Sequence, residues 1–215
     1  MIFDPLTTPT DLEIIELLSK GDRQTPANVA AHLDRNSRYM SGRLRDLEER
    51  GYIRDAPPAE RSGMYEITKL GKIVAFHIHA YVRDYQNIFH GISRYILEEQ
   101  PEDAFYPDLI KLDETGVDAL LEVDSTEGIV VPSHLEIKIV IEGGYTPQTT
   151  ADALFGLHYH GLAERVDGMD AYQITKRGKK AVELYREGTR EPVELTEQLR
   201  ETYTDEEKER LDILS

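Results

Sequence analysis

The fold of this chain is decided by residues 25–54, TPANVAAHLDRNSRYMSGRLRDLEERGYIR. Thr25, followed by a proline, predicts a helix start, because threonine caps free backbone amides and proline fits the first turn. Asn36 or Ser37 predicts the cap of the next helix, and Gly51 supplies the left-handed residue that ends it. The stretch therefore predicts two helices joined by a tight turn.

The residues on either side extend this pair into a larger unit. Upstream, Thr10 and Glu13 predict a capping box that opens another helix. Its apolar stripe would consist of Leu12, Ile15 and Leu18. Downstream, residues 52–55 and 64–67 predict two strands joined by a loop. Three helices followed by a two-stranded wing make a winged helix-turn-helix, so we expect a mainly α protein with small β wings, an α+β fold.

An internal repeat indicates that this unit occurs twice. The segment YEITKLGK at 65–72 recurs as YQITKRGK at 172–179, and the two copies match at six of eight positions. Gly51 precedes the first copy and Gly161 precedes the second at a similar distance. We therefore expect a second winged helix-turn-helix with helices at 117–123, 132–142 and 147–160, and Gly143-Gly144 as its turn. Residues 134–142 alternate like a strand as well as they fit a helix.

Charge separates the two copies. The chain has 25 Lys and Arg against 41 Asp and Glu, a formal net charge of −16. Such a chain has little general affinity for nucleic acid, because that affinity comes from phosphate neutralisation by basic residues. Residues 20–72 nevertheless hold 11 basic and 8 acidic residues, whereas residues 113–180 hold 6 basic and 12 acidic ones. We therefore expect duplex DNA to contact the first copy.

The helix after Asn36 has the features of a DNA-reading helix. A turn of about 100° per residue places Arg38, Gly42 and Arg45 opposite its apolar side. Arginine is the commonest reader of guanine, and a glycine between two arginines allows close approach of the backbone. The expected DNA-contacting residues are Arg35, Asn36, Ser37, Arg38, Tyr39, Ser41, Gly42, Arg45 and, on the wing tip, Arg61. The alternative is a solvated surface on which the arginines pair with Asp46, Glu48 and Glu49.

These segments resemble a known family. The Thr-Pro start, the Arg-Tyr of the third helix, the Arg-Leu that follows and the Gly-Tyr-Ile stop are similar to the winged-helix repressors of haloarchaea, the phiH-repressor group, and more distantly to the MarR group. The likeness covers roughly residues 10–75 and implies a DNA-binding transcriptional repressor. Acidity combined with 16 Arg against 9 Lys also resembles proteins of extreme halophiles.

An apolar seam follows the first wing. Its spacing of alternately four and three residues predicts one long helix over 70–99 that joins two protomers as a homodimer. The seam consists of Val74, Ile78, Tyr81, Tyr85, Ile88, Ile92 and Tyr95. The alternative is that this helix packs on the chain's own second domain. The expected boundaries are 1–69 for the DNA-binding winged helix, 70–99 for the long helix, 100–112 for a linker, 113–185 for the second winged helix and 186–215 for an exposed acidic tail or partner helix.

Other functions find less support in the sequence. The helix over 147–160 carries no Lys or Arg, so the second copy is expected to dock protein rather than to read DNA. Tandem winged helices also resemble the small acidic partners of chromosome-organising ATPases, and this leaves a protein-docking adaptor as the alternative function. No phosphate loop, nucleophile elbow or zinc motif is present, and we expect no enzyme activity, metal or cofactor. With no cysteine, no apolar run long enough for a membrane and no signal-peptide pattern, we expect a cytoplasmic protein.

Overall fold

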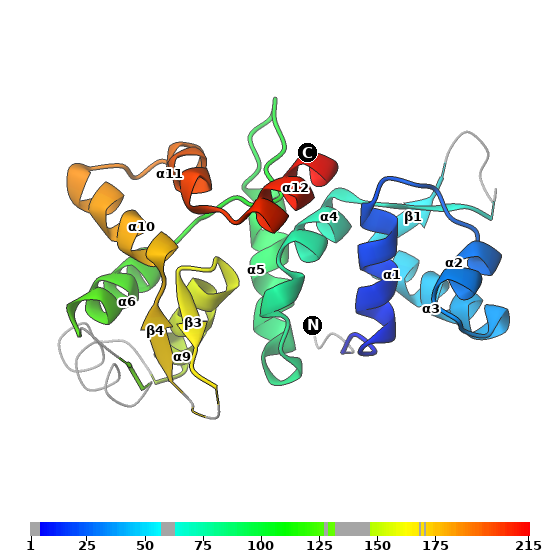
Figure 1. Ribbon diagram of the computed structural model, residues 1–215, viewed down its shortest axis with the longest axis horizontal. Coiled ribbons are helices and arrows are strands. Elements are labelled where there is room, and N and C mark those ends of the chain that lie inside the picture. The colour runs from blue at the N-terminus through cyan, green and yellow to red at the C-terminus, as the bar shows by residue number, and fades with distance from the viewer. Residues whose placement is uncertain (1–4, 57–62, 127–128, 132–146, 168, 170) are drawn as a thin grey trace. The chain divides into compact units, whose positions relative to one another are not determined.

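The computed structural model describes residues 5–56, 63–126, 129–131, 147–167, 169 and 171–215. The chain divides into two compact units. The N-terminal unit comprises Met1–His79, Ser93–Pro107 and Glu209–Ser215, and the second unit comprises Ala80–Ile92 and Asp108–Lys208. Both units are mainly helical, and each contains a small antiparallel hairpin (Figure 1). The expected α+β fold with small β wings is confirmed.

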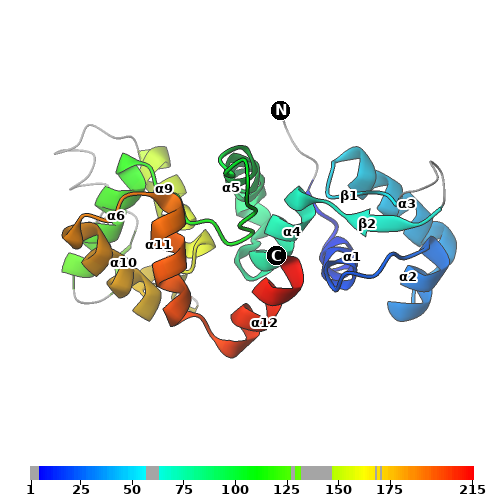
Figure 2. The same ribbon diagram turned by 90° about the horizontal axis from the view of Figure 1, so that it is seen from above.

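The N-terminal unit has the expected order of elements (Figure 2). It consists of α1 (Thr10–Ser19), α2 (Pro26–His32), α3 (Ser37–Glu49), β1 (Ile53–Asp55), β2 (Tyr65–Ile67) and α4 (Lys69–Phe76). In the wing, Ile53 of β1 lies opposite Ile67 of β2, and Gln24 adds a bridge to Tyr65. The hairpin follows α3 directly, so the wing and the third helix are fixed to the same core.

The helix caps follow the sequence signals in α2 and α3. The Thr25 side chain accepts a hydrogen bond from a backbone amide of the first turn of α2, and the Asn36 side chain does the same in α3. Gly51, which follows the C-cap residue Arg50 of α3, adopts a φ of +81°. A side chain is strained in this left-handed conformation, which explains the glycine.

The expected capping box of the first helix is wrong. α1 begins at Thr10 without any side-chain cap, so Thr10 and Glu13 do not cap it. Instead, the carboxylate of Asp11 accepts a hydrogen bond of 2.7 Å from the backbone N–H of Thr7. Asp11 is fully buried, and this bond joins it to the segment that precedes α1 and not to a free amide of the helix.

The expected continuous helix over 70–99 is also wrong. The chain forms α4, two 3₁₀ turns, η1 (Ile78–Ala80) and η2 (Arg83–Tyr85), and then α5 (Gln86–Glu98). Val74 is buried in the core of the N-terminal unit, whereas the ring of Tyr85 stacks on Phe155 of the second unit at a centroid distance of 5.0 Å. Packing within two separate units outweighs the few tenths of a kcal/mol by which residue propensities favour a helix. The seven seam residues therefore do not form one stripe.

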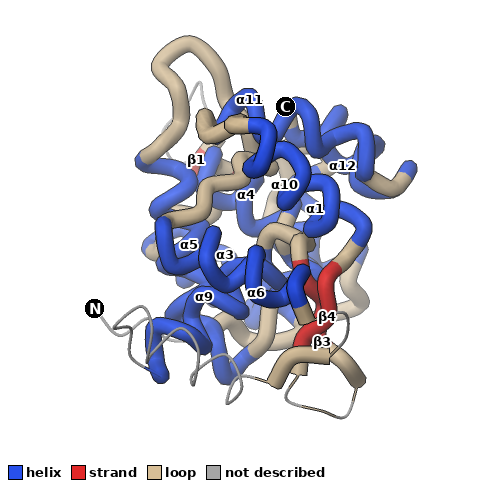
Figure 3. The backbone as a smooth tube through the Cα atoms, turned by 90° about the vertical axis from the view of Figure 1, so that its left-hand side faces the viewer, coloured by secondary structure: helices blue, strands red, loops and turns tan. Residues whose placement is uncertain are grey.

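The described part of the second unit has a first helix, a third helix, a hairpin and a following helix in the same order as the first unit. It contains α6 (Glu114–Ser125), α9 (Pro147–Tyr159), β3 (Ala163–Arg165), β4 (Tyr172–Ile174) and α10 (Lys176–Glu187). Ala163 pairs with Ile174, and Val130 adds a bridge to Tyr172, as Gln24 does in the first wing. Figure 3 shows β3 and β4 side by side. The helix expected over 132–142 and the Gly143-Gly144 turn lie outside the described residues.

The repeated signature performs the same task in both units. The hydroxyl of Thr68 donates to the carbonyl of Gly51 at 2.7 Å, and that of Thr175 donates to the carbonyl of Gly161 at 2.7 Å. Each threonine also caps the helix that follows it. Three residues further on, Gly71 and Gly178 pass so close to a backbone carbonyl that an added Cβ would lie 2.1 Å from its oxygen. The signature thus ties the helix after the wing to the turn after the third helix.

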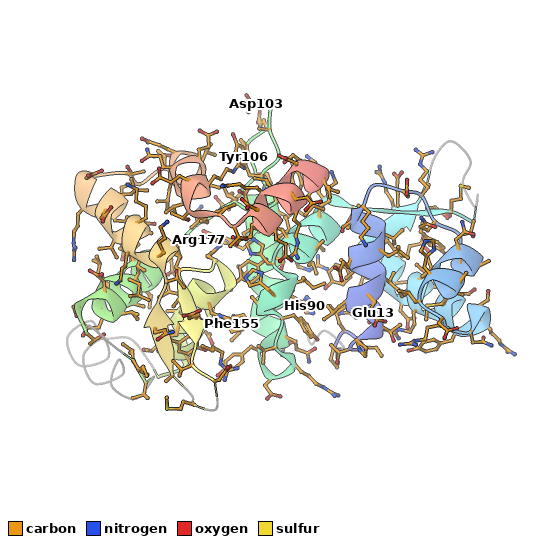
Figure 4. All side chains as sticks on the ribbon, in the orientation of Figure 1. Glu13, His90, Asp103, Tyr106, Phe155 and Arg177 are labelled. Carbon is orange, nitrogen blue, oxygen red and sulfur yellow. The ribbon has the colours of Figure 1, made fainter. Side chains whose placement is uncertain are left out.

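The expected exposed tail over 186–215 is wrong. The tail forms α11 (Pro192–Leu199), η4 (Arg200–Thr202) and α12 (Asp205–Leu214). Leu195 and Leu199 are buried in the core of the second unit. The guanidinium of Arg177 (Figure 4) lies 2.5 Å from the carboxylate of Glu207 and 4.2 Å from the ring centroid of Tyr203. Apolar burial and this ion pair hold the segment in place despite its acidic composition.

The expected linker over 100–112 is likewise part of the folded units. Asp108, Leu109 and Ile110 are buried. Both carboxylate oxygens of Asp108 accept hydrogen bonds of 2.7 Å from Arg200. One of the boundaries between the units falls after Pro107, inside the stretch expected to be a linker.

Candidate nucleic-acid interface

α3 has one buried side and one exposed side. Met40, Leu44 and Leu47 are fully buried in the N-terminal unit. Eight of the nine residues predicted to contact DNA are exposed: Arg35, Asn36, Ser37, Arg38, Tyr39, Ser41, Gly42 and Arg45. The ninth, Arg61, lies outside the described residues. We call the exposed side of α3 from Arg38 to Arg45 the arginine face.

Local hydrogen bonds order the start of the arginine face. The side-chain oxygen of Asn36 accepts from the backbone N–H groups of Arg38 and Tyr39, at 2.9 and 3.3 Å. The hydroxyl of Ser41 donates to the carbonyl of Ser37 at 2.9 Å. A Cβ added to Gly42 would meet nothing within 4 Å, so the helix surface is open at its centre.

The arginines of this region differ in their partners. The Arg38 side chain has no ion-pair partner among the residues that the structure describes. Arg45 lies 3.0 Å from Glu49, and Arg35 lies 3.8 Å from Glu13. The alternative expectation of surface pairing thus holds for Arg45 and Glu49. Exposed pairs contribute at most about 1 kcal/mol, so a stronger ligand can displace them.

Arg43 has a structural role that the sequence reasoning missed. Its guanidinium donates to the fully buried carboxylate of Asp11 at 2.9 and 2.6 Å, and it also pairs with Asp46 at 2.7 Å. The hydrogen bond to Asp11 is the largest cause of the raised pKa of Arg43. This ion pair fixes α3 against α1 and so sets the orientation of the arginine face. No local sequence pattern connects Asp11 in α1 with Arg43 in α3, 32 residues away.

Two further arginines contact Glu66 of the first wing, one from β1 and one from the segment between α1 and α2. Arg54 of β1 lies 2.7 Å from Glu66 of β2, and Arg23 lies 3.1 Å from the same carboxylate. Two arginines thus share one carboxylate on this surface. From the sequence, Arg61 was the one wing residue expected to contact DNA. Side chains alternate along a strand, so Arg54 points to the face of β1 opposite to that of the buried Ile53.

In the equivalent helix of the second unit, α9, the side that corresponds to the arginine face is covered by other side chains. Aligning Gly51 with Gly161 places Phe155 of α9 where α3 has Arg45. Phe155 (labelled in Figure 4) is fully buried, and its ring is nearly parallel to that of Tyr85. The guanidinium of Arg165 lies 5.7 Å from the centroid of the Tyr85 ring. The second unit therefore covers with aromatic side chains the side that the first unit exposes.

Burial sets the protonation of two histidines next to this closed helix. The pKa of His158 is lowered by desolvation. Desolvation also lowers the pKa of the fully buried His160 to about 3. Both are therefore neutral near pH 7. Among the described residues, no three His, Asp or Glu side chains gather as metal ligands.

Lowering the pH from 7 to 5 is expected to destabilise the second unit by about 2 kcal/mol through His160. The unfolded state binds this proton near pH 6.5, whereas the folded state binds it only near pH 3, so stability falls as the pH drops through this window. Urea unfolding at both pH values measures the difference. His160→Gln should lose this part of the pH dependence, and the exposed-site control His32→Gln should keep it. Equal pH dependence in all three proteins contradicts the prediction.

Of three comparisons with known proteins, one, with a protein family, gave a match. No helix in the described part of the chain is long and apolar enough to span a membrane. Searches of the curated proteins and of the solved structures found no match. Residues 7–54, which contain α1, α2, α3 and the start of the wing, match the family described as winged helix-turn-helix DNA-binding. This part of the chain is similar to that family, in agreement with the order of elements in the N-terminal unit.

Proposed function

We propose that the protein is a sequence-specific regulator of transcription that binds duplex DNA and acts as a repressor. The observation that carries this proposal is the exposed arginine face on a unit of DNA-binding type. Arg38 and Arg45 are seven residues apart, so they lie about 10 Å apart along the helix axis. This span corresponds to roughly three base pairs, which suits two arginines that read guanines in one major groove.

Selection from a pool of random duplexes tests sequence specificity. The full-length chain is expected to enrich a shared motif at fixed salt concentration, because the arginine face presents forked donors to base edges. Recovered sequences that resemble the starting pool would reject the proposal. Placing the enriched motif over a promoter is then expected to reduce reporter expression when the protein is present, and increased expression would indicate an activator.

We infer that the second unit docks protein and does not touch DNA. Its closed α9 side and its acidic composition support this assignment, since an acidic surface is repelled by phosphates. A protein-docking adaptor without DNA reading was the alternative function. The arginine face argues against it, because a pure docking module has no need of exposed arginines at this position.

We propose that the regulator is a homodimer, because a palindromic operator requires two-fold symmetry. Ile88, Ile92 and Tyr95 remain on one side of α5, and each keeps part of its surface in solvent. Light scattering at micromolar concentration is expected to give twice the monomer mass. Ile92→Glu should yield monomers, since an unpaired charge at an apolar interface is costly, whereas the control Glu98→Gln should remain dimeric. A wild type that is monomeric, although its circular dichroism shows that it is folded, contradicts the proposal of a homodimer.

A further inference from the structure

Of the three acids of α3, Asp46, Glu48 and Glu49, the last forms an ion pair with a residue of the arginine face. The carboxylate of Glu49, the last residue of α3, lies 3.0 Å from the Nε of Arg45. The side chains are 62% and 75% exposed, so the pair is solvated and both groups can be reached by a ligand. Arg38, two turns before Arg45, has no such partner among the described residues. The two arginines of the arginine face therefore meet DNA in different states.

Helix stability does not explain this placement. The carbonyl end of a helix carries partial negative charge, so an acid in the last turn is unfavourable. α3 has no basic residue in its last turn, and the base that pairs with Glu49 is Arg45, one turn earlier. A pair in which the acid follows the base by four residues is also the weaker of the two possible orders. The pair therefore adds little to the stability of α3.

The internal repeat provides an independent comparison. Aligned through Gly51 and Gly161, the positions of Arg45 and Glu49 are occupied by Phe155 and Tyr159 in α9. Both aromatic side chains are fully buried, and Tyr159 packs against Phe89 with ring centroids 5.2 Å apart. The charged pair thus occurs in the N-terminal unit, where this side of the helix is exposed. In the second unit, where the same side is buried, both positions are aromatic.

We propose that Glu49 is a specificity-determining residue of the DNA interface, a step that rests on the proposed function. When Arg45 turns to the O6 and N7 of a guanine, the carboxylate of Glu49 loses its partner. In the major groove it then accepts a hydrogen bond from the N4 amino group of a neighbouring cytosine. On other sequences it faces carbonyl oxygens and phosphates, and the repulsion weakens binding. Arg45 and Glu49 together select a guanine next to a cytosine.

The test compares full-length wild type, Glu49→Gln and Glu48→Gln. Each protein is titrated, at one salt concentration, with the duplex enriched by the wild type and with a scrambled duplex of equal composition. Both variants remove one negative charge from the end of α3, but no ion pair joins Glu48 to Arg45 in the described structure. Glu49→Gln is expected to bind the scrambled duplex about 5–10 times more tightly and the enriched duplex within about 3-fold, while Glu48→Gln keeps the wild-type ratio within about 2-fold.

The outcomes separate the two proposals. A repeat of the selection with Glu49→Gln is expected to lose the preference for cytosine at one position while the guanine is retained. An unchanged ratio of affinities in Glu49→Gln, or an equal fall in Glu48→Gln, overturns the role of Glu49 and leaves the proposed function intact. A wild type that binds both duplexes equally overturns both proposals.

Discussion

Replacing Arg43 by methionine is expected to destabilise the N-terminal unit by about 3–5 kcal/mol. The Asp11 carboxylate is fully buried and lies 2.6 Å from the guanidinium of Arg43. Methionine keeps the aliphatic stem but leaves this carboxylate without its cationic partner, and an uncompensated buried charge is costly. Urea unfolding followed by circular dichroism measures the change, and hydrogen exchange of the α1 and α3 amides locates it.

Two further variants make this expectation specific. Arg45→Met removes an exposed guanidinium from the same helix, so its effect on the free energy of unfolding should stay within about 0.5 kcal/mol. The double variant Asp11→Leu with Arg43→Met removes both charges and should recover much of the stability lost in the single variant. If Arg43→Met is as mild as Arg45→Met, the ion pair does not hold α3 in place.

Local signals allowed much of the fold to be predicted. A cap such as Asn36 and a stop such as Gly51 act through hydrogen bonds and backbone angles within a few residues, so sequence alone contains them. The repeated signature is equally readable, because Thr68 and Thr175 make the same contacts in both units. From these features, the described helices and the hairpin of each repeat could be predicted.

Long-range packing explains what the sequence did not reveal. The seam from Val74 to Tyr95 has helical spacing, but its residues pack into two different units. The acidic tail looked exposed by composition, although Leu195 and Leu199 complete the core of the second unit. In both cases the tertiary partner, rather than the local pattern, decides the structure.

The candidate site shows the same division. Helical periodicity was enough to place Arg38 and Arg45 on the exposed side of α3. The same helix contains Arg43, whose role depends on an acid in α1 that no local pattern connects to it. The wing arginines Arg23 and Arg54 were missed for a related reason, since they meet at Glu66 only through the strand register and the added bridge.

Removing both reading arginines is expected to abolish most of the sequence-specific binding. Arg38→Ala and Arg45→Ala should each weaken binding to the enriched duplex by about 1–3 kcal/mol, because each removes a forked contact with a guanine. Binding is measured by fluorescence anisotropy at fixed salt, since phosphate contacts are screened as salt rises. The double variant should approach the affinity of the wild type for the scrambled duplex.

The matched control is Arg186→Ala, which removes one exposed arginine from the second unit, where it pairs with Asp124 at 3.0 Å. It changes the net charge by the same amount as each reading variant, so an electrostatic effect of the whole chain would weaken all of them equally. If the arginine face reads bases, only Arg38→Ala and Arg45→Ala lose affinity for the enriched duplex. Equal losses on the enriched and scrambled duplexes would instead assign both arginines to phosphate contacts, because a lost phosphate contact weakens binding alike on every sequence.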